Sequence, residues 1–158
     1  MNETGTIGPI RKSVLVQAPA DRAFRVFTER FGEWWPLSDY SMAVDEELEG
    51  VSATGAVIEG RVGGRVFEVR SDGTESDWGK VLAWEPGVRL VLAWKPNRRP
   101  EPFTELEVRF TAEGDGTRVD LEHRGWEQLG DRAEKARVQY DMGWPGVLDR
   151  FASLAATA

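Results

Sequence analysis

His123 is the single histidine of the chain and its one side chain with an ordinary pKa near neutral pH. It alternates with Val119 and Leu121 in a strand-like run, so these three side chains share one face, and that face is apolar. An imidazole turned toward the interior could orient a ligand through a hydrogen bond or act as a general base. Alternatively, it would hold a backbone carbonyl or a helix residue in place. Because no partner motif accompanies His123, the sequence favours the structural role.

The rest of the chain offers little chemistry for catalysis or metal binding. It has no cysteine, no paired carboxylates at helical metal-ligand spacing, and no motif that presents a nucleophile to a base. The pair Gly63-Gly64 lacks the spacing of a phosphate-binding loop and precedes a strand-like run, which predicts a turn or bulge. We therefore expect no metal site, no cofactor and no catalytic residue, and the sequence favours a binding role over an enzymatic one.

Glu68 would change this expectation if its side chain were buried. It lies between Phe67 and Val69, whose shared phase predicts that they face the core and that Glu68 faces solvent. The opposite phase would bury the carboxylate, raise its pKa and make it a candidate acid. The solvated orientation is the one we expect.

Seven tryptophans in 158 residues are the unusual feature of the composition, and they indicate either core packing or an aromatic-lined pocket. Tyr140 and Trp144 are four residues apart in a helical pattern, so their rings share one face, as the roof of a pocket or as core aromatics. Trp34 and Trp35 are adjacent, so we expect one indole to be partly exposed, either at a pocket mouth or as a plug under a loop. Together with His123, the candidate ligand-binding residues are Trp34, Trp35, Trp78, Trp94, Tyr140 and Trp144.

Length and charge narrow the classes of function. A chain of 158 residues is the size of one domain. Its net charge of −7 argues against a nucleic-acid partner, which would require clustered Lys and Arg. No apolar stretch approaches the ~20 residues of a membrane span, and the polar N-terminus has no signal-peptide pattern. We expect a soluble protein, and the absence of cysteine is compatible with the cytoplasm.

Turn residues divide the chain into short elements. Alternating apolar residues predict a strand over 10–18, followed by a helix over 20–29 and a short helical turn that Gly32 ends. An acidic segment without clear periodicity, 39–50, is predicted to be a loop. Six further strand-like runs are separated by turn signals, which predicts an antiparallel meander: 53–59, 65–70, 76–84, 88–94, 103–111 and 117–124.

The C-terminal stretch changes to a helical period. From Leu129 to about Ala155 the apolar residues lie three or four apart, which predicts a long amphipathic helix with a bend near 141–144 caused by Gly143 and Pro145. This helix has the one long apolar stripe that could cover the apolar face of the sheet. A strongly twisted sheet of about seven strands curls around a helix without touching it along its whole length. We therefore expect a cavity between the two.

An ordered set of short sequence patterns runs along the chain: SVLVQAP at 13–19, GGR at 63–65, WGKVLAWEP at 78–86, LVLAW at 90–94, GTRV at 116–119, LEHRGW at 121–126, and Tyr140 with Gly143-Trp144. This set resembles the START-like superfamily, also called Bet v 1-like or SRPBCC, and within it the branch related to the C-terminal domain of the activator of Hsp90 ATPase. The resemblance implies an α+β helix-grip fold, in which a curved antiparallel sheet of about seven strands wraps a long C-terminal helix and two short helices follow the first strand. It implies a single START-like domain over 9–156, with 1–8 as a flexible N-terminus.

This resemblance implies a fold more firmly than a function, because the superfamily includes lipid carriers, hormone receptors and polyketide aromatases. The leading expectation is a binding module for a small hydrophobic or aromatic molecule, held between the sheet and the C-terminal helix. One alternative is a cyclase or aromatase type of enzyme that uses the same cavity. A second alternative is an interaction protein with an Hsp90-type partner.

Overall fold

A computed structural model of the protein describes residues 8–36, 50–94 and 103–157. The predicted acidic loop falls largely outside these described residues, as does the N-terminus before Gly8. The elements in chain order are β1 (Ile10–Val16), α1 (Ala20–Glu29), α2 (Phe31–Trp34), β2 (Ala53–Ile58), β3 (Arg65–Arg70), β4 (Glu75–Glu85), β5 (Arg89–Trp94), β6 (Thr104–Glu113), β7 (Gly116–Arg124), a 3-10 helix η1 (Trp126–Arg132) and α5 (Ala133–Thr157).

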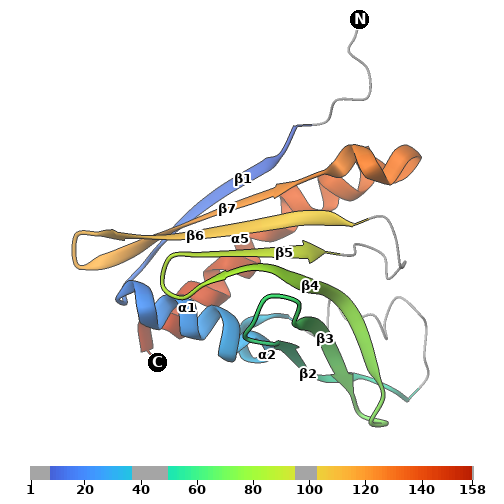
Figure 1. Ribbon diagram of the computed structural model, residues 1–158, viewed down its shortest axis with the longest axis horizontal. Coiled ribbons are helices and arrows are strands. Elements are labelled where there is room, and N and C mark those ends of the chain that lie inside the picture. Colours follow the sequence, from blue (N-terminus) through green and yellow to red (C-terminus); the bar gives the residue numbers. More distant parts are fainter. Residues whose placement is uncertain (1–7, 37–49, 95–102, 158) are drawn as a thin grey trace, which may run out of the picture.

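The strands form one antiparallel sheet of seven, in the order β1-β7-β6-β5-β4-β3-β2. Strands β2 to β7 form a meander in which each strand pairs with the next. The first strand, β1, pairs with the last, β7, and Val14 lies opposite Val119. Helix α5 crosses the concave face of this curled sheet, and α1 and α2 pack beside it (Figure 1). The predicted α+β helix-grip architecture is confirmed. Val147, Leu148 and Phe151 of α5 are buried against the sheet and α1, as the apolar stripe predicted.

The curl of the sheet is concentrated in one half. The pairing register shifts within β2/β3, β3/β4 and β4/β5, whereas β5/β6, β6/β7 and β1/β7 pair without a shift. Such bulges bend a strand and increase its local twist. Gly79 lies in the shifted region, where a Cβ atom would come within 1.7 Å of the carbonyl oxygen of Ala93. Only glycine therefore permits β4 and β5 to approach each other at this point.

Helix α2 differs from its prediction. Gly32 was expected to end the helical turn, but α2 continues through it to Trp34. A Cβ atom on Gly32 would lie 2.8 Å from the backbone nitrogen of Ala56. The glycine therefore allows α2 to press against edge strand β2, and it is not a helix stop.

The last helix begins later than the periodicity indicated. The apolar residues from Leu129 belong first to η1, which contains Gly130 in a left-handed region with φ of 60°. Regular α-helix starts at Ala133 and continues through Pro145 to Thr157. The bend expected near 141–144 stays a prediction. No helix within the described segments is both long and apolar enough to cross a membrane.

Candidate functional site

The aromatic residues singled out in the sequence meet in one cluster between the sheet and α5. Trp78 comes from β4, Trp94 from the end of β5, and Trp144 from α5, while Trp35 follows α2 directly. Ring centroids lie 5.9 Å apart for Trp78 and Trp94, and 6.5 Å apart for Trp94 and Trp144. All four indoles are buried. Trp78, Trp94 and Trp144 thus form an aromatic wall, to which the neighbouring strands β4 and β5 and the distant helix α5 each contribute one ring.

Trp34 and Trp35 are both buried, with exposed fractions of 1% and 5%, so the expectation that one indole would be partly exposed is wrong. Their rings contact each other, with centroids 6.1 Å apart, and both contact Phe31, but their other partners differ. Trp34 packs against Phe27 and Phe151 and donates its indole N–H to the carbonyl oxygen of Val26 at 3.1 Å. Trp35 packs against the aromatic wall instead. Adjacent residues can both be buried here because the chain runs between α5 and the sheet, with apolar partners on both sides.

His123 faces the interior and is fully buried, as strand parity predicted. Its Nδ1 lies 3.2 Å from the indole nitrogen of Trp144, and its Nε2 lies 2.8 Å from Oγ1 of Thr104. An indole N–H can only donate, so Nδ1 must be the acceptor and the proton of the neutral ring lies on Nε2. That proton is donated to Thr104, which in turn donates to the carbonyl oxygen of Trp94 at 3.2 Å.

This arrangement leaves His123 neutral and engaged. Burial lowers its pKa to about 3, because the interior penalises the charged ring. Both ring nitrogens already have partners within the protein, so the imidazole can neither accept a proton near neutral pH nor bond a ligand without losing one of them. Among the roles considered from the sequence, the geometry supports the structural one, in which the histidine fastens Trp144 of α5 to β6 and β7.

Tyr140 provides a second polar link between α5 and the sheet. The indole N–H of Trp94 donates to the Tyr140 hydroxyl oxygen at 3.0 Å. The tyrosine side chain is half-buried, and its ring lies edge-on to His123 with centroids 5.0 Å apart. Tyr140 and Trp144 therefore do share the face of α5 that covers the sheet. The hydroxyl group stands at the border between the aromatic wall and its less buried surroundings.

The prediction that Glu68 faces solvent is wrong. Its side chain is fully buried, together with Val66 and the largely buried Arg70, so these three residues define the inner face of β3. The phase was misread because Phe67 is also buried, on the opposite face, where the guanidinium of Arg65 lies 4.1 Å from its ring centroid. An apolar residue covered by a long side chain resembles a core residue in the sequence.

The buried carboxylate of Glu68 joins the aromatic wall through Trp78. The indole N–H of Trp78 donates to Oε1 at 3.2 Å, and Nε of Arg70 donates to Oε2 at 2.8 Å. A charge in this environment persists only when it is paired and hydrogen-bonded. Glu68 and Arg70 thus form an ion pair on the inner face of β3, although Glu68 was predicted to face solvent.

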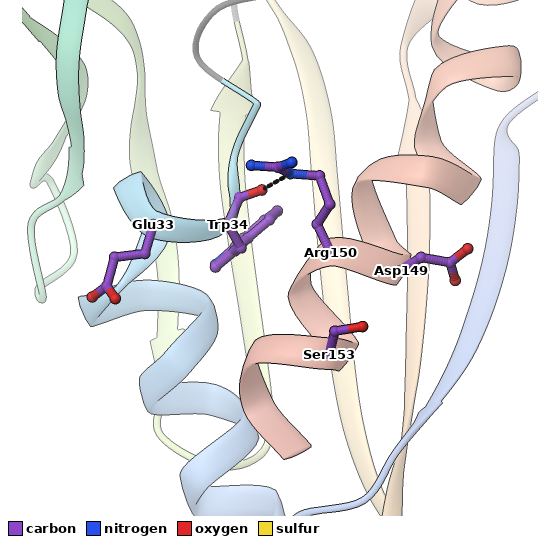
Figure 2. A pocket seen from close by; sticks show the side chains of 5 residues that line it. All are labelled: Glu33, Trp34, Asp149, Arg150 and Ser153. Atoms are coloured by element: carbon purple, nitrogen blue, oxygen red, sulfur yellow. Dashed lines mark hydrogen bonds between the residues drawn. The ribbon is translucent and has the colours of Figure 1, made fainter. Parts of the chain in front are cut away.

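A separate open pocket of about 360 Å³ lies on the surface between α2 and α5. Figure 2 shows Arg150 above Trp34, whose backbone oxygen accepts a hydrogen bond from Nε of Arg150 at 2.8 Å. The carboxylates of Glu33 and Asp149 point away from each other on either side of it. Trp34 is the one predicted site residue in this pocket, which Ser153 also lines. It is not the cavity that the sequence analysis expected.

The polar side chains beside the aromatic wall are held by hydrogen bonds within the protein. Neither His123 nor Glu68 stands apart from other side chains as a proton acceptor, since each has at least two hydrogen-bond partners. Within the described parts of the chain, no three His, Cys, Asp or Glu side chains gather as a metal site would require. What the interior offers is a set of flat aromatic faces with a few polar groups at their edges.

Comparisons with known proteins place this geometry in a wider group. The family model described as "Activator of Hsp90 ATPase homolog 1-like protein" matches residues 17–156. No curated protein matches the chain. The solved structure of Txn09, an anthrahydroquinone-γ-pyrone synthase, is 36% identical, with a TM-score of 0.63 and coverage of 96% of this chain and 99% of that chain.

Two further structures extend the comparison. CalC from Micromonospora echinospora, a self-sacrificing resistance protein, is 31% identical with a TM-score of 0.69, over 94% of each chain. A protein from Chromobacterium violaceum, 19% identical, has a TM-score of 0.65 over 95% of this chain and 99% of that chain, a likeness of fold alone.

Proposed function

We propose that this chain, which belongs to the Activator of Hsp90 ATPase homolog 1-like family, binds a small planar aromatic molecule between its sheet and α5. The observation that carries this proposal is the aromatic wall of Trp78, Trp94 and Trp144 on the concave side of the grip. Flat rings of this kind favour flat ligands, because stacked or edge-on aromatic pairs contribute about 0.5–1.5 kcal/mol each beyond the burial of their area.

The polar groups beside the wall suggest a ligand with hydroxyl or carbonyl substituents. Tyr140 carries a hydroxyl at the border of the wall and is held there by Trp94. His123 is less suited to this role, because its ring nitrogens already bond Trp144 and Thr104. Tyr140 is therefore the residue that we expect to orient the ligand, while burial of ring surface supplies the affinity.

The name of one similar protein supports an aromatic ligand. Txn09 is named for the synthesis of an anthrahydroquinone-γ-pyrone, a fused-ring product, and it matches nearly the whole chain at 36% identity. CalC, at 31% identity, is named as a resistance protein. One of these names describes a reaction and the other a protective role, so binding is the property that we extend to this chain.

The test is a titration of the purified protein with alizarin, a hydroxylated anthraquinone, followed by tryptophan quenching and calorimetry. We expect one saturable site, and we expect Trp94→Leu to weaken binding about tenfold or more, because it removes one wall ring and the partner of Tyr140. Trp84→Leu is the matched control, since Trp84 also lies on a strand but packs against Phe24 at 5.0 Å. Equal weakening by both substitutions, or no saturable binding to the wild type, would overturn the proposal.

A cyclase type of enzyme is the second candidate, favoured by the synthase name of Txn09. In that case the protein would hold a flexible precursor in the conformation that cyclises, since His123 is not available as a base near neutral pH. Incubation with aromatic polyketide precursors, with products followed by mass spectrometry, tests this candidate. Turnover that is lost in His123→Gln while alizarin binding persists would make His123 a participant in catalysis. Turnover that survives the substitution would support catalysis by positioning alone.

A further inference from the structure

We infer that the indole of Trp35 occupies the place of the ligand in this structure, so that binding requires this side chain to leave the aromatic wall. The inference rests on the proposed function, because it takes the wall of Trp78, Trp94 and Trp144 as the binding surface. It goes further by separating Trp35 from the wall. Trp35 becomes an internal plug, and the residues around it define where a ligand ring lies.

The contacts of Trp35 are those expected of a bound aromatic molecule. Its ring centroid lies 5.6 Å from Trp78, 5.5 Å from Trp94 and 5.9 Å from Trp144. It is the one ring that contacts all three members of the wall within the described residues. Phe31 adds a further contact at 5.5 Å, and the side chain is 5% exposed. The indole of Trp35 therefore covers the face that the three wall rings share.

The three wall residues are each anchored through their indole N–H groups. Each belongs to β4, β5 or α5, and each donates its indole N–H to a side chain of the interior. Trp78 donates to Glu68, Trp94 to Tyr140, and Trp144 to His123. These bonds fix both the position and the tilt of the wall rings. Through these bonds, the Glu68–Arg70 ion pair and the buried His123 both hold wall rings in place.

Trp35 lies outside any regular element. Helix α2 has four residues and ends at Trp34, and Trp35 follows with an extended backbone at φ −69° and ψ 130°. Its backbone N–H donates to the carbonyl oxygen of Phe31 at 3.0 Å. Rotation of one residue at the end of so short a helix would withdraw the indole without breaking a pair of strands. No comparable movement is open to Trp94, which pairs with Gly79 on one side and Thr104 on the other, or to Trp78, which lies inside β4 at the register shift against β3.

The plug also indicates the size of the ligand. A group that replaces Trp35 against the wall must present at least the flat area of an indole, and tryptophan buries roughly 150–250 Å². A planar molecule of two or more fused rings meets this requirement, whereas a single benzene ring does not cover all three wall residues. We therefore assign the site to fused-ring aromatic compounds.

The sign of one substitution tests this inference. If Trp35 lines the site, Trp35→Ala removes a contact and weakens alizarin binding. If Trp35 fills the site, the same substitution removes a competitor and tightens binding, because the apparent affinity no longer carries the cost of populating the open state. We expect Trp35→Ala to bind alizarin about tenfold or more tightly than the wild type. Trp35→Leu, which keeps an apolar side chain, serves if the alanine variant does not fold.

Trp84→Ala is the control, since Trp84 packs against Phe24 at 5.0 Å, away from both Trp35 and the wall. It should leave the dissociation constant within about twofold of the wild type. A second readout uses wild-type protein labelled with 5-fluorotryptophan, in which alizarin should shift the fluorine resonance of Trp35 toward that of a solvated indole. Weaker binding in Trp35→Ala, or a Trp35 resonance unmoved at saturation, would overturn the plug while leaving the proposed function intact. Absence of alizarin binding in every variant would instead overturn both.

Discussion

Two polar clusters lie on the concave side of the sheet, one made of neutral groups and the other built around an ion pair. Around His123, every group is neutral, and each hydrogen bond joins a ring, a hydroxyl or a carbonyl. Around Glu68, a carboxylate is paired with the guanidinium of Arg70 and bonded by an indole. In both clusters an indole N–H is the link to the aromatic wall. The interior thus tolerates polar groups where they orient tryptophans, whether through a neutral acceptor or through a charge.

This difference predicts that substitutions in the two clusters lower the free energy of unfolding by different amounts. Removing one partner of a buried ion pair leaves the other charge without compensation, whereas losing a neutral hydrogen bond leaves a single unsatisfied donor or acceptor. The Glu68 cluster should therefore be the more sensitive of the two. Three measurements of stability test this comparison.

The largest effect is expected for Glu68→Ala, which should lower the free energy of unfolding by about 3–5 kcal/mol because it removes the buried carboxylate that pairs with Arg70 and accepts the indole N–H of Trp78. Urea denaturation measures this loss. The double substitution Glu68→Leu with Arg70→Met is the control, and it should recover most of the stability because both charges of this pair are removed together. A loss below ~1 kcal/mol for Glu68→Ala would show that solvent reaches this carboxylate.

The His123 cluster should respond to pH. The folded-state pKa of about 3 lies below the unfolded value of 6.5, so the unfolded chain binds a proton first as the pH falls. The stability contributed by neutral His123 is complete above pH 6.5 and decreases below it, down to the folded-state pKa. Between pH 7 and pH 5 this decrease should amount to about 2 kcal/mol.

The His123→Gln variant isolates this contribution, because the variant protein lacks the imidazole while its carboxylates titrate as in the wild type. Urea denaturation of both proteins at the two pH values gives the comparison. The wild type should lose about 2 kcal/mol more than the variant between them. An equal loss in the two proteins would mean that His123 is protonated in the folded state, and the assigned hydrogen bonds would then be wrong.

The smallest effect compares the two indole donors directly. Trp78→Phe and Trp144→Phe remove the same atoms from similarly buried rings, so the difference between them reports on the lost hydrogen bonds. Trp78 donates to a carboxylate and Trp144 to a neutral imidazole. Trp78→Phe should therefore cost about 1 kcal/mol more in the free energy of unfolding, since bonds to charged groups are the stronger ones. A larger cost for Trp144→Phe would reverse the ranking of the clusters.

The architecture could be predicted because it depends on local periodicity. Alternation of apolar residues indicated the strands, and short turns required neighbouring strands to pair as a meander. The three-to-four spacing from Leu129 onward indicated a helix with a buried stripe at Val147, Leu148 and Phe151. His123 could be placed inside because its strand neighbours Val119 and Leu121 are unambiguously apolar. Each of these inferences uses residues that are close together in the chain.

The candidate site depends on contacts that no local pattern contains. The partners of His123 lie on β6 and α5, and the sequence spacing of Thr104 and Trp144 carries no sign that they meet on one ring. Strand parity alone could not decide the side of Glu68, because both faces of β3 bury an apolar residue, Val66 on one and Phe67 on the other. The pairing of Arg70 inside and the cover of Arg65 outside decided it.

By itself, the sequence determined the element order, the antiparallel sheet wrapped around a C-terminal helix, and the supply of tryptophans from which a wall could be built. Tertiary structure decided which indoles face one another and which of them, Trp35, lies over the other three. The physical reason is that burial of a polar or aromatic group is set by its partners, and here those partners come from separate strands and from α5.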